Sequence, residues 1–272
     1  MKDTTAIRIS PSHTGPEKPR NNRRMFDVAT RSNRGRVRET NEDSFLVVQI
    51  PGGNDLLMAV ADGVSGGQAG DIASKYALQA MLKAYMEQRE SELGIPDIDT
   101  AEEVLSNGIE AANKRLDHLN SNLDGKHFMI GTTITALILL PQYGVVANAG
   151  DSRGYQWHNQ KLEQLTKDHT WAQNLVDIGE LLPEEVAGHP WEHTLSNCLG
   201  SLPEIVHSVR KFERSPGDKY LLCTDGVTQM MDNSELRDII AQNKSATEIA
   251  EEIVVLCLHR GGFDNLTLTL SC

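Results

Sequence analysis

The helical segments of this chain come in pairs, and each pair stands between runs of strand-like segments. From Gln68 onward, small and apolar residues recur at i, i+3 and i+4, which predicts an amphipathic helix with one buried face. A second helix is expected from Thr100 to about Asn120, because Thr100 is a suitable N-cap and Glu103 stands in the capping-box position. Two more helices are expected at about 233–242 and 245–259. A regular βαβ array would place single helices between strands, so this order favours antiparallel sheet flanked by helices, an α+β fold.

The strand-like segments are short and rich in Val, Ile, Thr and Leu. They lie at 26–32, 44–50, 56–61, 130–140, 143–150, 152–159, 205–212, 219–224 and 265–271. Only short polar turns separate the segments between 130 and 159, so we expect them to pair as one antiparallel meander. The stretch 91–99 is expected to be the loop between the first two helices. No internal repeat or linker divides the chain, so we expect one domain.

Charge is distributed unevenly along the chain. Residues 1–24 hold six Lys or Arg and two Asp or Glu, whereas the remainder holds 20 basic and 36 acidic residues. The Pro, Asn and Ser content of residues 1–24 predicts a disordered basic tail. The acidic body repels nucleic acid phosphates, so we expect no nucleic-acid partner. An anionic substrate would need a cation to join it to the protein.

The sequence predicts neither export nor a membrane span. The longest apolar run, ITALILL, is far shorter than the ~20 residues that cross a bilayer. The N-terminus lacks the apolar core of a secretory signal, so we expect a cytoplasmic location. No C-x-x-C pair occurs, and we expect reduced thiols rather than disulfides or zinc ligands. The cysteines are Cys198, Cys223, Cys257 and Cys272.

Carboxylates stand at the ends of several strand-like segments. Asp62 ends the run LLMAVA and Asp225 follows YLLCT, each before a Gly-Val pair. The others are Glu42, Asp43, Asp151 and Asp264. An Asp-Gly pair after a strand is also a common turn, so each position alone has a purely structural explanation. Several acids at one rim of a core would repel one another unless a cation neutralised them, and oxygen ligands alone favour Mg²⁺, Mn²⁺ or Ca²⁺ over zinc.

Seven short motifs occur in an order and spacing typical of one protein family. They are RGRVRETNEDSF, VADGVSGGQAGDIAS, GTTITALI, ANAGDSRGY, LTKDHT, LLCTDGVT and GGFDNLTL. From about residue 26 to 271 the chain resembles the metal-dependent type 2C protein Ser/Thr phosphatases, and most of all their compact bacterial members. The resemblance implies a four-layer αββα sandwich, with two central antiparallel β-sheets flanked by helices. It also implies a single catalytic domain over 25–272, with a flap at about 166–193.

The same resemblance assigns a metal-binding role to five residues. It implies two ions in the active site, Mn²⁺ or Mg²⁺, with Asp62 bridging both and the carbonyl of Gly63 binding one of them. Asp225 and Asp264 would hold the other ion. Asp151 matches the aspartate that helps to hold a third metal in many bacterial members.

Three further residues are implied to act on water and substrate. Glu42 and Asp43 match residues that hold metal-bound water, and Arg38 matches the arginine that grips the substrate phosphate. A water shared by two divalent ions has a lowered pKa and can attack phosphorus in line, while the ions and Arg38 neutralise the phosphate oxygens. The implied function is hydrolysis of phosphoserine and phosphothreonine in proteins, reversing Ser/Thr kinase signalling. We expect a monomeric enzyme that forms no phosphoenzyme.

The sequence departs from the family pattern next to Asp62. Many eukaryotic members have a histidine, a proposed general acid, where Val64 stands, and Gly is usual at the position of Ser65. The histidines of the flap region fit a proton donor or a substrate contact, but also plain surface or turn positions; they are His169, His189 and His193. Trp171 and Trp191 fit either a peptide-binding edge or packing of the flap.

Two other functions are compatible with parts of this pattern. A phosphohydrolase with an aspartyl nucleophile would generally have Asp two residues before Asp225, where Cys223 stands. A non-catalytic member of the same fold could serve as a binding or signalling module. Such proteins usually lose metal aspartates, whereas Asp62, Asp225 and Asp264 are all retained here.

Overall fold

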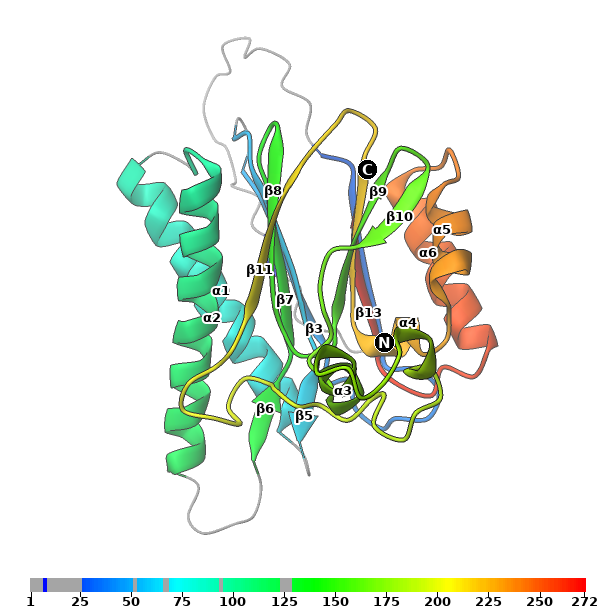
Figure 1. Cartoon of the computed structure of the whole chain (residues 1–272). Helices are drawn as coiled ribbons and strands as arrows, with labels where there is room; N and C mark the ends of the chain where they lie inside the picture. Colours follow the sequence, from blue (N-terminus) through cyan, green and yellow to red (C-terminus); the bar gives the residue numbers. More distant parts are fainter. Residues whose placement is uncertain (1–6, 9–25, 51–52, 66–68, 93–94, 123–128) are drawn as a thin grey trace.

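The computed structural model describes residues 7–8, 26–50, 53–65, 69–92, 95–122 and 129–272. Two β-sheets lie face to face, and helices cover the outer face of each, so Figure 1 shows four layers from left to right. The expected α+β sandwich of two antiparallel sheets flanked by helices is therefore confirmed. None of the described helices is both long and apolar enough to cross a bilayer.

The first sheet has the strand order β1-β3-β4-β7-β8-β11. These strands are β1 (Ile7–Arg8), β3 (Ser44–Gln49), β4 (Leu56–Ala61), β7 (Ile134–Leu139), β8 (Tyr143–Ala149) and β11 (Ser208–Glu213). The pair β1–β3 is parallel and the other pairs are antiparallel. Strand β1 comes from the segment expected to be a disordered tail, and the other residues of 1–24 lie outside the described residues.

The second sheet has the order β10-β9-β12-β13-β2, with all neighbours antiparallel. Its strands are β10 (Lys161–Gln164), β9 (Arg153–His158), β12 (Lys219–Cys223), β13 (Leu266–Ser271) and β2 (Val28–Asn33). The expected meander over 130–159 is therefore wrong in its last strand, because β9 lies in a different sheet from β7 and β8. The chain crosses between the sheets at Gly150, whose φ of 110° is open to glycine but not to most side chains.

The segment 130–140 also differs from expectation. It forms two strands, β6 (Ile130–Thr132) and β7, which separate at Thr133. Strand β6 pairs with β5 (Gly63–Ser65) in a small two-stranded sheet. Strand β10 and the short helix α4 (Asp225–Thr228) were not expected from the sequence.

Two long helices cover the first sheet, and a shorter pair covers the second (Figure 1). They are α1 (Gly70–Glu92), α2 (Ile98–Ser121), α5 (Asn233–Ile240) and α6 (Ala246–His259), whereas α3 (Trp171–Asp177) and a 3₁₀ turn at Pro183–Glu185 lie in the flap region. The expected N-cap at Thr100 is wrong. The N-cap of this helix is Asp97 instead. Its carboxylate accepts a hydrogen bond from the Thr100 N–H at 2.8 Å.

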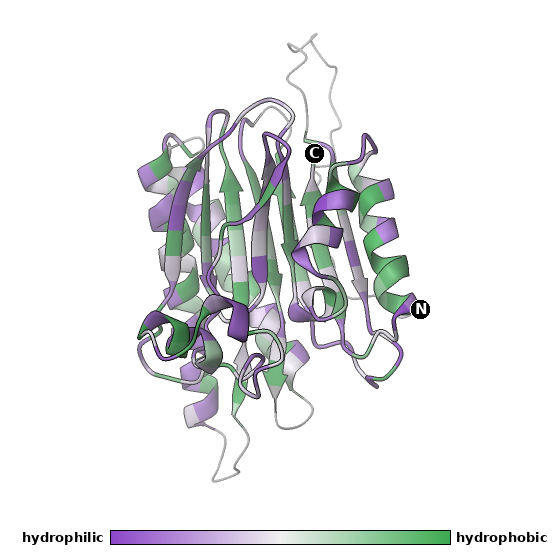
Figure 2. Cartoon of the chain, turned by 45° about the vertical axis from the view of Figure 1, so that its right-hand side comes forward, coloured by the Kyte–Doolittle hydropathy of each residue, from purple (hydrophilic) through white to green (hydrophobic). Residues whose placement is uncertain are grey.

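Three apolar layers hold the four structural layers together. Strand β4 shows how: Leu57, Ala59 and Ala61 pack toward α1 and α2, and the alternate residues pack against the second sheet. Both faces of β4 are covered, so all six of its residues are buried. A third cluster joins the second sheet to α5 and α6. Figure 2 accordingly shows hydrophobic residues along the central strands and mixed polarity along the helices.

Candidate functional site

A pocket of about 300 Å³ opens at the end of the sandwich where β4 and β12 finish. It is lined by Arg38, Glu42, Asp62, Gly63, Val64, Thr133, Asp151, His193, Leu195, Asp225, Asp264 and Asn265. Seven of the eight residues expected at the site line this pocket, although they come from five separate parts of the chain. Asp43, the eighth, lies behind the lining.

The backbone of Asp62 is held on both sides by Thr132, the last residue of β6, and by Thr133, which separates β6 from β7. Its N–H donates to Thr133 Oγ1 at 3.0 Å. Its carbonyl accepts from Thr132 Oγ1 at 2.8 Å and from the Thr133 N–H at 2.9 Å. The break between β6 and β7 therefore orients the residue that ends β4.

Glycines 63 and 70 allow three chain segments to meet beside Asp62. A Cβ on Gly63 would lie 2.2 Å from the Gly70 carbonyl oxygen. A Cβ on Gly70 would lie 2.5 Å from Glu42 Oε2 and 2.7 Å from the Gly63 carbonyl oxygen. A side chain at Gly70 would fill the space between the Gly63 carbonyl and the Glu42 carboxylate, and one at Gly63 would collide with the Gly70 and Glu42 backbone carbonyls.

Asp225 occupies the first position of α4, directly after β12 and Thr224. Its Oδ2 accepts a hydrogen bond from Gln229 Nε2 at 2.5 Å, while its Oδ1 has no hydrogen-bond partner among the described residues. Gly226 permits a close approach to β13, because a Cβ there would lie 2.0 Å from the Asn265 carbonyl oxygen. That approach brings Asp225 to the segment that carries Asp264.

Arg38 and Asp264 meet at the pocket rim. Arg38 Nη2 donates to Asp264 Oδ2 at 2.7 Å, and this bond raises the pKa of the guanidinium. The Arg38 side chain is otherwise largely exposed. The guanidinium can therefore reach an anion in the pocket after a small rotation.

Asn265 fixes the loop that carries Arg38 and Glu42. Its Nδ2 donates to the carbonyls of Arg34 and Thr40, each at 2.9 Å, and its Oδ1 accepts from the Glu42 N–H at 2.8 Å. One buried amide thus closes the loop onto the start of β13.

Asp43 is only 1% exposed and is not among the residues that line the pocket. Its Oδ2 accepts from Thr224 Oγ1 at 2.8 Å, and its Oδ1 has no hydrogen-bond partner among the described residues. Burial raises the pKa of this carboxyl to about 7.

The pocket carboxylates raise one another's pKa values. Burial and the nearby charges of Asp43 and Asp225 hold the pKa of Asp62 well above its ordinary value. Burial and the charge of Asp264 raise the pKa of Asp225, and burial and the charge of Asp225 raise that of Asp151. Ionising all of these groups together requires a compensating positive charge.

This donor set fits hard divalent cations. The described residues contain no group of three Asp, Glu, His or Cys side chains that forms a metal-ligand set by itself. Mg²⁺, however, is usually held by one or two carboxylates and keeps several waters. The carboxylate oxygens of the pocket suit such an ion, as do the Oδ1 atoms of Asp43 and Asp225, which have no hydrogen-bond partner among the described residues.

The three flap histidines occupy different environments. His193 lines the pocket, whereas His169 is bonded to the turn before Asp151. His189 packs edge-on against Trp191, with ring centroids 5.7 Å apart. Trp171 and Trp191 are about half exposed, 51% and 49%, so neither is sealed into the packing of the flap.

Sequence reasoning did not identify the polar residues that hold the site together. These are Thr132, Thr133, Thr224 and Asn265. A signal was present, since each is a polar residue at the end of a buried apolar strand. All four cysteines are free, as expected.

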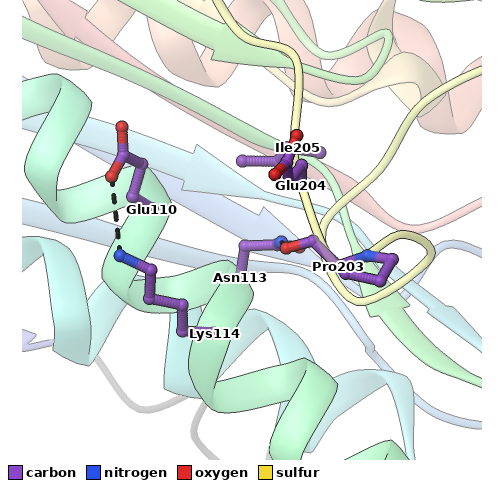
Figure 3. Close-up of a pocket in the computed structure, with 6 residues that line it drawn as sticks. All are labelled: Glu110, Asn113, Lys114, Pro203, Glu204 and Ile205. Atoms are coloured by element: carbon purple, nitrogen blue, oxygen red, sulfur yellow. Dashed lines mark hydrogen bonds and ion pairs between the residues drawn. The ribbon is translucent and has the colours of Figure 1, made fainter.

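A second pocket, of about 360 Å³, lies between α2 and the segment 203–205 (Figure 3). Its polar groups are already engaged: Lys114 pairs with Glu110 at 3.7 Å, and Asn113 Nδ2 donates to the carbonyls of Leu202 and Pro203. Asn113 therefore anchors this segment to α2. The carboxylate pocket is the stronger candidate for chemistry.

Comparison with known proteins identifies the family to which the chain belongs. Residues 33–254 match the family model described as protein phosphatase 2C. A serine/threonine phosphatase named stp from Listeria welshimeri is 35% identical over 246 residues, which cover 88% of this chain and 93% of that protein. The chain therefore belongs to the protein phosphatase 2C family.

Solved structures agree with the fold. The crystal structure of the Mycobacterium tuberculosis serine/threonine phosphatase PstP/Ppp has a TM-score of 0.77 at 31% identity, covering 91% of this chain and 98% of that one. The catalytic domain of PstP in complex with two manganese ions has a TM-score of 0.71 at 30% identity, covering 91% and 97%.

Proposed function

We propose that this protein is a metal-dependent phosphatase that hydrolyses phosphoserine and phosphothreonine in proteins. The convergence of five carboxylates and Arg38 on one pocket carries this proposal. Relatives named serine/threonine phosphatase and the manganese-bound PstP domain support it. The substrates are those of a Ser/Thr kinase, and the protein acts as a monomer.

Two Mn²⁺ or Mg²⁺ ions would be held by Asp62, the carbonyl of Gly63, Asp225 and Asp264. When bound, such ions supply an activated water and neutralise phosphate charge. Asp151 would contribute to a third metal position.

Glu42, which lines the pocket, and the buried Asp43 next to it would hold waters around the ions. Thr224 and Asn265 keep these two acids in place, through Asp43 Oδ2 and the Glu42 backbone. Because the pocket carries many negative charges, a phosphate enters it only together with compensating cations.

Arg38 orients the phosphate. Its planar guanidinium can bind two phosphate oxygens at once, which fixes the phosphorus for in-line attack. Its bond to Asp264 keeps it at the rim before substrate arrives.

The departing serine or threonine oxygen receives its proton from His193. Val64 offers no proton, and His193 is the histidine that lines the pocket. Replacing His193 with Ala should slow hydrolysis of a phosphothreonine peptide but spare p-nitrophenyl phosphate, whose leaving group needs no proton. Equal loss on both substrates would remove His193 from this role.

The proposed function is tested by turnover of a phosphothreonine peptide. We expect hydrolysis with Mn²⁺, loss of activity with EDTA, and loss again in Asp62→Asn. Asp238→Asn removes an exposed carboxylate on α5 and serves as the matched control. Turnover that EDTA does not lower would refute the metal mechanism. Absence of turnover by the Mn²⁺-loaded protein would favour a non-catalytic binding module.

A further inference from the structure

His169 is bonded twice to the residue that directly precedes Asp151. The His169 N–H donates to the Gly150 carbonyl at 3.0 Å, and the Gly150 N–H donates to His169 Nδ1 at 3.2 Å. Gly150 has a φ of 110°, and a Cβ there would lie 2.6 Å from the Thr133 side chain. The turn is therefore unusual in its backbone, and His169 satisfies both of its polar groups.

The remaining contacts of His169 reach two other segments. Asn197 Nδ2 lies 2.9 Å from Nδ1, and Nε2 lies 3.0 Å from Ser208 Oγ on β11. Since two N–H groups point at Nδ1, this nitrogen is unprotonated and Nε2 carries the hydrogen. Burial lowers the pKa of His169, in agreement with a neutral ring.

The neighbouring Asp168 holds the other side of the same turn. Arg153 donates to both Asp168 oxygens, with bonds of 2.6 to 3.0 Å, and Gln164 Nε2 adds a bond at 3.0 Å. The consecutive residues Asp168 and His169 thus bind Arg153 and Gly150, which lie on either side of Asp151 in the chain. Asp151 itself is buried and lines the pocket.

We propose that His169 is a positioning residue that directs the Asp151 carboxylate into the pocket through the Nδ1 bond to Gly150, and so sets the affinity of the metal position that Asp151 serves. This inference rests on the proposed function. Partners that orient metal ligands typically change metal affinity by about 10- to 100-fold when they are lost.

Two substitutions separate the two ring nitrogens. In His169→Asn the amide oxygen can occupy the place of Nδ1 and accept from Gly150, whereas in His169→Gln the amide reaches toward Ser208 and leaves Gly150 unpaired. Mn²⁺ alone is titrated by calorimetry into the full-length protein, and melting in EDTA confirms that each variant is folded. If His169→Gln does not fold, His169→Met replaces it.

The Mn²⁺ position that is lost in Asp151→Asn should bind Mn²⁺ about 10- to 100-fold more weakly in His169→Gln and with nearly the wild-type affinity in His169→Asn. Adding His169→Gln to Asp151→Asn should cause no further loss. Equal affinities in both variants, the reverse order, a further loss in the double variant, or no Mn²⁺ position sensitive to Asp151→Asn would overturn the proposal. Turnover of a phosphothreonine peptide by the wild-type protein is measured separately, so failure of the proposed function is distinguishable.

Discussion

Strands β4 and β12 each have an aspartate at both ends. The surroundings of these carboxylates differ between the two ends of the sandwich. Asp55 precedes β4 and is only 5% exposed; it accepts a hydrogen bond from Tyr85 at 2.5 Å and pairs with Arg89. Asp218 precedes β12 and accepts from the Ser215 N–H at 2.8 Å, among several partners. At this end of the sandwich, each buried carboxylate has its own donors.

At the other end the carboxylates face one another. Asp62 and Asp225 follow the same two strands, and burial together with nearby acids raises the pKa of each. Asp225 Oδ1 has no hydrogen-bond partner among the described residues. Removing one member of a buried pair lowers the stability of the fold, because the other charge is left uncompensated. Crowded buried carboxylates lower the stability unless a cation binds. The contrast between the two ends therefore distinguishes carboxylates with a structural role from carboxylates that need a bound cation.

The largest effect is expected for Asp225→Asn. Loss of a metal ligand removes several kcal/mol of transition-state stabilisation, so turnover of a phosphothreonine peptide should fall by about 1000-fold. The metal-free variant should melt no lower than the wild-type protein, because like-charge repulsion is relieved. Kinetics with Mn²⁺ and thermal melts in EDTA measure the two effects. A marked drop in metal-free Tm would show that Asp225 stabilises the fold as Asp55 does.

The reverse pattern is expected for Asp55→Asn at the paired end. Removing one partner of a buried ion pair leaves Arg89 uncompensated and costs about 3–5 kcal/mol of unfolding free energy, or roughly 10 °C in Tm. Activity well below the Tm should be unchanged. Denaturant unfolding checks the loss, with Glu251→Gln as the control. That substitution breaks an exposed pair with Arg31, which should matter little. Similar losses in the two variants would contradict the comparison.

The order of strands and helices could be predicted from periodicity, but the assignment of strands to sheets could not. Strands 56–61 and 265–271 were located closely because apolar runs and flanking turns are local signals. The transfer of β9 to the second sheet depends on the turn at Gly150, and Thr133 separates β6 from β7. Both features depend on tertiary contacts, which periodicity does not report.

The same limit applies to the candidate site. The motifs placed the acids at strand ends, and seven of the eight expected residues line the pocket. Asp43 does not line the pocket, and its carboxylate accepts a hydrogen bond from Thr224, which is 181 residues away along the chain. Asn265 supports the loop from 34 to 42 by bonds that cross more than 220 residues of sequence. No local pattern contains those bonds.

A smaller effect is expected at the rim, where one carboxylate of the crowded end does have a cationic partner. Arg38→Ala should lower kcat/KM for a phosphothreonine peptide by about 10- to 100-fold, as for the loss of a hydrogen bond to a charged group. Arg38→Lys should recover only part of this, since an ammonium cannot bind two oxygens in a plane. Steady-state kinetics at saturating Mn²⁺ measure both. Full recovery of kcat/KM in Arg38→Lys would show that Arg38 contributes only its positive charge. An unchanged kcat/KM in Arg38→Ala would exclude Arg38 from phosphate binding.

The smallest effect is expected for Asp43→Asn in metal-free protein. Burial raises the pKa of Asp43 to about 7 from the ordinary value of 3.8, so the folded state favours the protonated form. Ionised Asp43 therefore destabilises the fold above pH 7, and this penalty disappears as the pH falls from about 7 toward 4. Asn stays neutral and can still accept from Thr224, so the variant should melt a few degrees higher at pH 8, with the gain vanishing near pH 4. Thermal melts in EDTA across this pH range measure the gain, with Asp238→Asn as the exposed control. A gain in Tm that grew as the pH fell would contradict this account. Asp43 would then resemble the paired acids at the far end of β4.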